Sequence, residues 1–334
     1  MNFSGNTPAV EAEGLVKLFG QQRAVDGVSL VVPRGSVYGV LGPNGAGKTT
    51  TIRMLATLLR PDSGSARIFG HDVVTEPTAV RSLVGVTGQY ASVDEDMTAT
   101  ENLVIFSRLL GLSRADARRK SNELLEEFDL TEAASKPLKN FSGGMRRRLD
   151  LAASLIAAPP LLFLDEPTTG LDPRTRAQMW ETIRRLVREG STVLLTTQYL
   201  DEADQLADRI AVIDRGQVIA DGTADELKAS VGVSSLHLTL VDKTHVERAR
   251  TLVAEFLRTE VAVTPETGRV TAPMTDSSVT PELLIRLRDN GIGVDEITVS
   301  KPSLDEVFLT ITGHTADSHT ADSHTTDSEE ESAA

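Results

Sequence analysis

The sequence of 334 residues predicts an α/β fold with a parallel sheet, followed by a small α+β domain and a polar tail. A glycine-rich loop at residues 42–49 stands between a strand-like and a helix-like apolar segment. Strand and helix patterns then alternate over residues 159–223, which is typical of a parallel sheet. After residue 227 the order becomes strand, helix, two strands, helix and strand, which indicates a ferredoxin-like domain.

The glycine-rich loop, GPNGAGKT, fits the phosphate-binding pattern G-x-x-x-x-G-K-[ST]. It follows a strand expected at residues 36–41 and opens a helix expected at 48–59. Glycines let several backbone N–H groups surround phosphate oxygens, and the helix start adds the positive end of its dipole. Lys48 is expected to reach the β- and γ-phosphates, and Thr49 to ligate Mg²⁺. The expected nucleotide contacts in this loop are Gly42, Pro43, Asn44, Gly45, Ala46, Gly47, Lys48, Thr49 and Thr50.

A second element is the apolar segment at residues 160–164, which ends in Asp165 and Glu166. Continuous apolar runs are typical of buried parallel strands, and ligands bind at the carboxyl ends of such strands. Asp165 is expected to hold Mg²⁺, and Glu166 to take a proton from the attacking water. A solvated turn after a core strand is the alternative, and the nearby phosphate loop favours the catalytic interpretation.

A third element is the segment NFSGGMR at residues 140–146, before a helix expected at 147–158. Ser142 has the features of an N-cap, and the amides of Gly143 and Gly144 at the helix start form a second anion site. One fold does not need two such sites for a single γ-phosphate. We therefore expect the second site to bind a nucleotide that another subunit holds.

In order and spacing these motifs resemble the ATP-binding cassette (ABC) family, over roughly residues 10–223. The matching segments are the phosphate loop, the signature FSGGM at 141–145, FLDE at 163–166, Gln89 in TGQY, and GLD at 170–172. The resemblance implies a homodimer in which two cassettes enclose two ATP molecules. The signature of each cassette would then face the phosphate loop of the other.

The resemblance also implies roles that pattern alone leaves open. Gln89 would contact Mg²⁺ and the attacking water, and the segment after it would face the membrane partner. Phe19 falls where the family has an aromatic residue that stacks on adenine, although an isolated Phe would otherwise be assigned to the core. Asp172 falls among the nucleotide-contacting residues.

Two positions depart from the family pattern. Gln198 stands where most cassettes have His, and Met145 replaces the common Gln of the signature. Because an amide forms hydrogen bonds but carries no proton, Gln198 is expected to bind the γ-phosphate and position water rather than shuttle protons. The signature is expected to bind phosphate mainly through Ser142 and backbone N–H groups. The replacement of Gln by Met145 is therefore expected to be tolerated.

Three further segments resemble the daunorubicin-resistance (DrrA-like) type of ATP-binding subunit: residues 85–103, 194–204 and 302–309. This resemblance implies the ATPase of an exporter for hydrophobic drugs or secondary metabolites. It would act with a separate integral membrane permease, at the cytoplasmic face of the cell membrane. The alternatives are export of a lipid or another amphiphile, a soluble ABC ATPase in translation or DNA repair, and a non-hydrolytic switch, which Glu166 disfavours.

The composition limits the classes of protein to which this chain can belong. The net charge of −14, of which the tail at 314–334 contributes −6, argues against a nucleic-acid partner. The basic run at 146–148 is expected to form a solvated or salt-bridged face. No cysteine is present, which excludes disulfides and thiolate metal sites, and no apolar run approaches the length of a membrane span. The first eight residues are polar and lack an apolar segment, so no secretory signal is expected there.

The chain is therefore expected to comprise a cassette at residues 9–227, with a helical subdomain at about 91–158, an accessory domain at 231–313 and a tail at 314–334. The tail repeats with a period of five residues and has no apolar content, so it is expected to be disordered. Its histidines are expected to be solvated rather than bound to metal. The resemblance alone implies a dimer-stabilising or docking role for the accessory domain.

Overall fold

The computed structural model describes residues 7–87, 93–232 and 234–312. The expectations for Gln89 and for the tail from residue 314 lie outside these residues. The chain divides into two compact units, Met1–Leu227 and Lys228–Ala334, and the boundary falls within α8 (Ala224–Val231). The first unit contains two hydrophobic cores and the second contains one, and each unit is described by itself.

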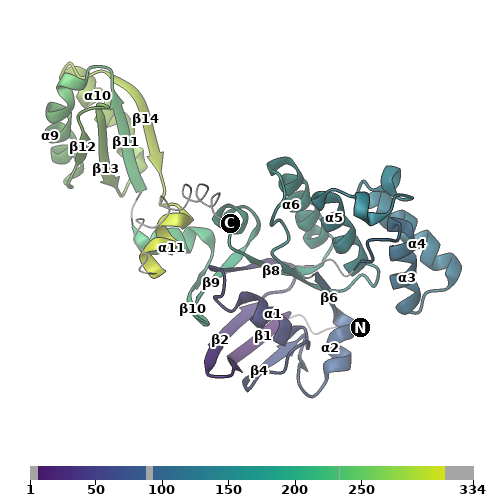
Figure 1. The fold of residues 1–334 in the computed structure, drawn as a ribbon. Helices are drawn as coiled ribbons and strands as arrows, with labels where there is room; N and C mark the ends of the chain where they lie inside the picture. The colour runs from purple at the N-terminus through teal and green to yellow at the C-terminus, as the bar shows by residue number, and fades with distance from the viewer. Residues whose placement is uncertain (1–6, 88–92, 233, 313–334) are drawn as a thin grey trace, which may run out of the picture. The chain divides into compact units, whose positions relative to one another are not determined.

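A six-stranded sheet is the centre of the first unit, with the strand order β10-β9-β3-β8-β7-β6 (Figure 1). Its strands are parallel except for β10, which pairs antiparallel with β9. The parallel order confirms the predicted α/β fold. The strands are β3 (Val37–Leu41), β6 (Val84–Thr87), β7 (Leu161–Asp165), β8 (Thr192–Thr197), β9 (Arg209–Asp214) and β10 (Gln217–Gly222).

The central sheet separates two cores, and β7 contributes to both. Leu161 and Phe163 belong to the core on one face, while Leu162 and Leu164 belong to the core on the other. This alternation explains why the whole strand is apolar. The first core also contains α1 (Lys48–Leu55), α2 (Pro77–Leu83) and a second, antiparallel sheet of β1 (Val10–Phe19), β2 (Gln22–Val32), β4 (Ser63–Ile68) and β5 (His71–Asp72).

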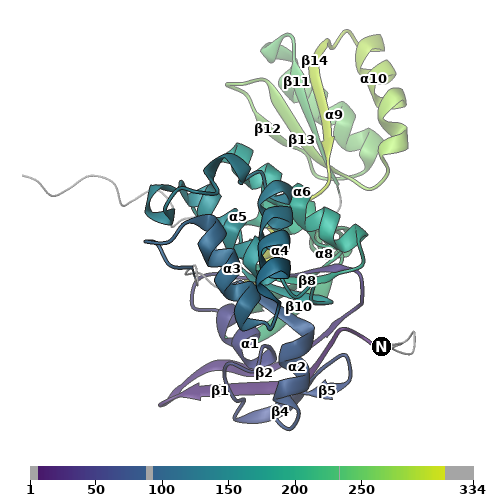
Figure 2. The same ribbon diagram turned by 90° about the vertical axis from the view of Figure 1, so that its right-hand side faces the viewer.

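The second core is covered by helices, with α3, α4 and α5 grouped together (Figure 2). Thr98 and Glu101 form a capping box at the start of α3, and Ser113 caps α4. The elements on this face are α3 (Ala99–Leu109), α4 (Arg114–Glu127), η1 (Thr131–Ala133), η2 (Leu138–Asn140), α5 (Gly143–Ser154), α6 (Pro173–Arg188) and α7 (Leu200–Leu206).

Two helices differ in extent from the expectations. The helix after the phosphate loop ends at Leu55 rather than at residue 59, because Thr57 adopts a left-handed conformation with φ of 61°. The signature helix begins at Gly143, directly after its cap, and ends at Ser154 rather than spanning 147–158. Ala158, with φ of 45°, lies in the turn that leads into β7.

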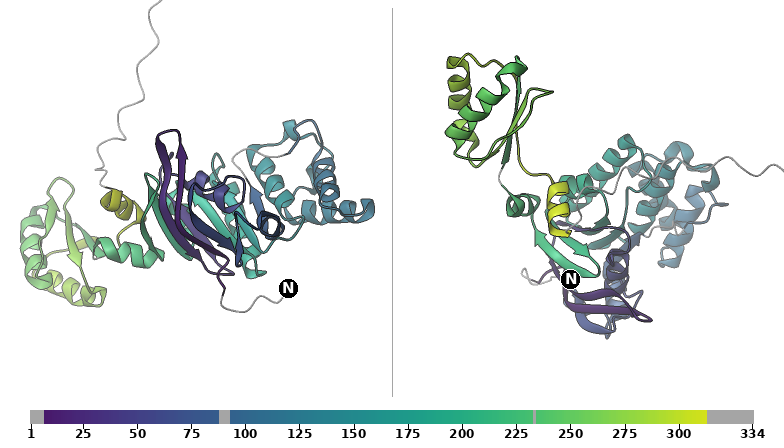
Figure 3. Two further views of the ribbon diagram at one scale, coloured as in Figure 1. Left: turned by 90° about the horizontal axis from the view of Figure 1, so that it is seen from below. Right: turned by 60° about the vertical axis from the view of Figure 1, so that its left-hand side comes forward.

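The second unit has the βαββαβ order of a ferredoxin-like domain, with the sheet order β12-β13-β11-β14. All its strand pairs are antiparallel, and both long helices cover one face of the sheet (Figure 3). Its elements are β11 (Ser234–Leu240), η3 (Lys243–His245), α9 (Val246–Leu257), β12 (Ala262–Thr264), β13 (Arg269–Met274), η4 (Ser277–Val279), α10 (Thr280–Asp289), β14 (Val294–Ser300) and α11 (Leu304–Thr312).

Within the described ranges, none of the helices combines the length and the apolar character that crossing a bilayer requires.

The packing of β7 leads to a stability prediction. Phe163 is fully buried at the middle of β7, so Phe163→Ala should lower the free energy of unfolding by about 3–5 kcal/mol. Val31→Ala, at a position that is 54% exposed, should change it by no more than about 0.5 kcal/mol. Urea unfolding of both variants measures the difference, and equal effects would contradict this description of the core.

Candidate nucleotide site

Three adjacent strands of the central sheet end at one place, and β8 lies between the other two. The amide of Gly42, after β3, donates to the carbonyl oxygen of Thr197 at 3.3 Å. The amide of Glu166, after β7, donates to the carbonyl oxygen of Thr196 at 3.1 Å. The end of β8 therefore fixes both the glycine-rich loop and the turn that carries the carboxylates.

The glycines of the loop allow close backbone contacts. A Cβ atom at Gly42 would lie 2.2 Å from the carbonyl oxygen of Ile213, and one at Gly47 would lie 2.4 Å from that of Ala24. Gly47 directly precedes α1 and has φ of 103°, and Gly45 has φ of 81° in open space. Only glycine fits at Gly47, because both the backbone conformation and the space exclude a side chain.

Lys48 is enclosed by the loop and is only 4% exposed. Its Nζ donates to the carbonyl oxygens of Gly42 at 2.7 Å and Pro43 at 3.0 Å, and lies 3.5 Å from Glu166 Oε1. Burial lowers the pKa of Lys48, while the charges of Glu166 and Asp165 oppose that shift. The structure thus brings the expected phosphate-binding cation and the expected general base together.

Asp165 lies at the end of β7 and accepts two hydroxyl hydrogen bonds. Thr49 Oγ1 donates to its Oδ1 at 3.0 Å, and Thr196 Oγ1 donates to the same oxygen at 2.5 Å. Mg²⁺ usually binds one or two carboxylates together with nucleotide phosphates and water. A hydroxyl and a carboxylate side by side fit that donor set, and the described residues contain no larger cluster of acidic or histidine ligands.

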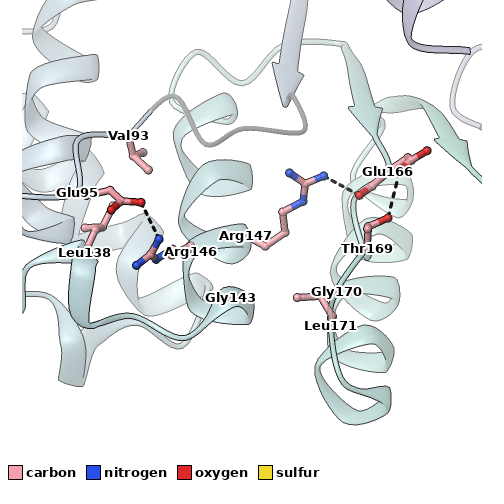
Figure 4. Close-up of a pocket in the computed structure, with 10 residues that line it drawn as sticks. All are labelled: Val93, Glu95, Leu138, Gly143, Arg146, Arg147, Glu166, Thr169, Gly170 and Leu171. Atoms are coloured by element: carbon pink, nitrogen blue, oxygen red, sulfur yellow. Dashed lines mark hydrogen bonds and ion pairs between the residues drawn. The ribbon is translucent and has the colours of Figure 1, made fainter. Parts of the chain in front are cut away.

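Glu166 occupies a constrained turn. Its φ of 49° is left-handed, and its side chain is almost fully buried. Thr169 Oγ1 donates to its Oε2 at 3.3 Å, and Arg147 Nη2 donates to its carbonyl oxygen at 2.7 Å (Figure 4). A cavity of about 530 Å³ lies between this turn and the signature helix, bordered by Glu166, Arg147 and Gly143.

The signature segment forms a separate helix start. Ser142 caps α5 and accepts a hydrogen bond from the amide of Met145 at 3.3 Å, as the sequence predicted. Ser142 and Gly143 are exposed, while Gly144 packs closely against Thr175 at the start of α6. Within the described ranges, no hydrogen bond or ion pair joins Ser142 to the group formed by Lys48, Asp165 and Glu166.

Sequence comparisons identify both units. Residues 25–169 match the family described as ABC transporter, and residues 222–312 match the C-terminal domain of ATP-binding proteins described as DrrA1-3-like. The daunorubicin/doxorubicin resistance ATP-binding protein DrrA of Streptomyces peucetius is 56% identical, covering 93% of this chain and 94% of that protein. The chain belongs to the DrrA-like ATP-binding subunits of the ABC family.

Other relatives and solved structures agree with this assignment. The doxorubicin resistance ATP-binding protein DrrA of Mycobacterium tuberculosis is 44% identical, covering 93% of this chain and 95% of that protein. A solved ATP-binding subunit of an ABC transporter is 30% identical with a TM-score of 0.60, covering 66% of this chain and 92% of that one. As a member of this family, the chain is an ATP-binding ATPase subunit.

The structure also shows the exposure and the local setting of the other residues that the ABC resemblance singled out. Phe19, at the end of β1, is 52% exposed rather than part of the core, and Lys17 Nζ lies 6.0 Å from its ring centroid. Asp172 is exposed and caps α6 through the amides of Arg174 and Thr175. Three more expected contacts are placed as follows: Asn44 is exposed at the loop tip, Thr50 is half-buried in the first turn of α1, and Gln198 is half-buried directly after β8.

The basic run at 146–148 was expected to form a solvated or salt-bridged face, and its members differ: Arg146 and Arg147 both form ion pairs, but Arg147 is not solvated. Arg146 forms a salt bridge with Glu95 at 2.7 Å, whereas the Arg147 side chain is only 14% exposed, lies 3.9 Å from Asp150 and donates to backbone carbonyls of the turn after β7. Arg148 donates to the carbonyl oxygen of Phe128. Successive side chains point about 100° apart around a helix, and nothing in three identical residues shows which of them faces inward. Thr196 was also missed, since a Thr in an apolar strand gives no signal.

The loop geometry predicts different effects at two glycines. Gly47→Ala should lower ATP affinity about tenfold or more, because its Cβ would strike Ala24 and its φ is unfavourable for other residues. Gly45→Ala has the same conformational problem but no clash, so its loss should be smaller. Calorimetric titration with ATP measures both, and wild-type affinity in Gly47→Ala would contradict the description of this loop.

Proposed function

We propose that this chain hydrolyses ATP to drive the efflux of hydrophobic, anthracycline-like drugs or secondary metabolites through a separate membrane permease. The observation that carries the hydrolytic part is Glu166 Oε1 at 3.5 Å from Lys48 Nζ, beside the pair of Thr49 and Asp165. The observation that supports the substrate class is the similarity to the daunorubicin/doxorubicin resistance protein across 93% of the chain.

In this proposal the loop amides and Lys48 bind the β- and γ-phosphates of ATP. Thr49 and Asp165 hold Mg²⁺, which neutralises phosphate charge when it is bound, and Gln89 is a further ligand from outside the described residues. Glu166 accepts a proton from the attacking water at its carboxylate, which the Thr169 hydroxyl and Lys48 orient. Gln198 donates a hydrogen bond to the γ-phosphate.

The second anion site acts on a partner's nucleotide. The start of α5 contains Ser142, Gly143 and Gly144, and its first residues are exposed. The Ser142 side chain caps this helix and forms no hydrogen bond with the described phosphate loop of its own cassette. In a homodimer each helix start would contact the ATP held by the other cassette. Phe19 has the exposure that stacking on adenine requires, and Asp172 lies in the loop that would face the partner.

We further propose that the chain is held at the cytoplasmic face of the membrane by its permease. The relatives that carry both units are named as ATP-binding proteins of drug resistance.

Export of a different amphiphile is the second candidate, because the Nod factor export ATP-binding protein I of Ralstonia nicotianae is 48% identical over 67% of this chain. Efflux assays with reconstituted permease, comparing daunorubicin with a lipid-like amphiphile, separate the two.

Substitution of the proposed general base tests the hydrolytic mechanism. Glu166→Gln should keep ATP binding and slow hydrolysis by ~10²–10⁴, because the amide cannot accept the proton from water. An ATP-bound dimer should accumulate, and efflux by the reconstituted pair should stop. Glu181→Gln, which changes an exposed carboxylate on α6, is the matched control. Wild-type phosphate release by Glu166→Gln would remove Glu166 from this role.

Substitution at the signature tests the trans arrangement. Ser142→Arg should leave ATP binding by the monomer unchanged but prevent ATP-dependent dimerisation and turnover, because a bulky side chain replaces the cap of an exposed helix start. Ser82→Arg on α2 adds the same side chain at another exposed serine and should not affect dimerisation. The trans assignment fails if Ser142→Arg abolishes binding of ATP by the isolated monomer. Chromatography with light scattering and ATP titration provide both measurements.

A further inference from the structure

The side chain of Arg147 joins the signature helix to the catalytic turn. Its Nη2 donates to the carbonyl oxygens of Asp165 and Glu166, each at 2.7 Å, and its Nε donates to that of Pro167 at 3.0 Å. One guanidinium therefore binds three consecutive backbone carbonyls at the end of β7. Figure 4 shows the side chain extending from α5 across the cavity to this turn.

This turn needs external support. Glu166 has a left-handed φ of 49°, which is unfavourable for a residue with a side chain and persists only where surrounding contacts hold it. On one side, the Glu166 amide donates to the carbonyl oxygen and to Oγ1 of Thr196 on β8, each at 3.1 Å. On the other side, Arg147 holds the Glu166 carbonyl. The turn is thus fixed between the sheet and the signature helix.

Among the described residues, the hydrogen bonds of Arg147 go to the backbone of the turn and not to the Glu166 carboxylate. The Glu166 carboxylate approaches Lys48 and Thr169, whereas the hydrogen bonds from Arg147 to this turn go to its backbone carbonyls. Arg147 Nη1 also lies 3.9 Å from Asp150 Oδ2 on the same helix. Burial lowers the pKa of Arg147, while the charges of Asp150, Asp165, Glu202 and Glu166 oppose that shift. Guanidinium groups are always charged in proteins. Hydrogen bonds from a charged donor in a partly buried setting are strong enough to fix a backbone conformation.

We propose that Arg147 is a positioning residue for Glu166, so that each cassette's signature helix holds its own general base in place. Arg147 lies on α5, the helix that Ser142 caps. One face of α5 would thus contact the partner's nucleotide while another sets the geometry of hydrolysis within its own cassette. This role rests on the proposed function, in which Glu166 is the base and Ser142 acts in trans.

The test is a set of substitutions with kinetics of ATP hydrolysis. Arg147→Met keeps much of the volume but removes all three hydrogen bonds, and should lower kcat about 10- to 100-fold with KM for ATP within about twofold. Arg147→Lys should recover only part of the lost kcat. Its ammonium group restores a charged donor but cannot reproduce the planar fork that binds several carbonyls at once. Added methylguanidinium should raise the turnover of Arg147→Ala, since the cavity lies beside the vacated position.

Arg148→Met is the matched control, because Arg148 is the next residue of α5 and donates to Phe128 rather than to the catalytic turn. It should keep kcat within about twofold of the wild-type value. In the Glu166→Gln background, Arg147→Met should still form the ATP-bound dimer, which separates positioning of the base from binding. Thermal melting of every variant identifies loss of folding.

Two results would overturn this role. Wild-type kcat in Arg147→Met would show that the turn does not depend on the guanidinium. Equal losses in Arg147→Met and Arg148→Met, with equally lowered melting temperatures, would show a structural effect of the helix. Failure of the proposed function gives a different pattern, in which the wild-type protein itself does not hydrolyse ATP or Glu166→Gln does not form the dimer.

Discussion

The pairing of β8 between β3 and β7 is the constraint on which the nucleotide site depends. In this register Thr196 lies opposite Val40 on one side and Asp165 on the other. The carbonyl and hydroxyl oxygens of Thr196 then accept hydrogen bonds from the Glu166 amide, and the Thr196 hydroxyl donates one to Asp165. A slip of one residue would turn alternate side chains to the opposite face of the sheet. Asp165 would then leave Thr49, and the loop would lose its fixed relation to the carboxylates.

Charge balance within the site follows from that register. Lys48, Asp165 and Glu166 are all nearly buried, which is unfavourable for charged groups unless they are paired and hydrogen-bonded. Loop carbonyls surround the ammonium, threonine hydroxyls contact the carboxylates, and the opposite charges lie within a few ångströms. Because the groups share partners, the effects of substituting two of them are not expected to add.

The second unit combines alternating apolar strands with a long-range strand pairing. Alternating apolar residues on β11 and β13 face α9 and α10, and the pairing of the first strand with the last closes the sheet. The relatives named for drug resistance match the chain over both units, whereas the Nod factor relative covers 67% of it.

The sequence by itself determined the motifs and the order of the elements. The spacing of the glycine-rich loop, the apolar strand with its two carboxylates and the capped signature helix was sufficient to place Lys48, Thr49, Asp165 and Glu166 at one end of a parallel sheet. It was sufficient because parallel strands bring their carboxyl ends to one edge whatever lies between them. The βαββαβ pattern predicted the second unit for a similar reason, since its short connections leave few topologies.

Only the tertiary structure decided which neighbouring side chain reaches the site. Three consecutive arginines on α5 contact Glu95, the turn after β7 and Phe128 respectively, and the exposure of Phe19 separates it from the core. The left-handed turn at Glu166 likewise has no local signal, because Glu does not favour that conformation. These features depend on contacts between segments distant in sequence, which impose a direction or a conformation that the residue alone does not prefer.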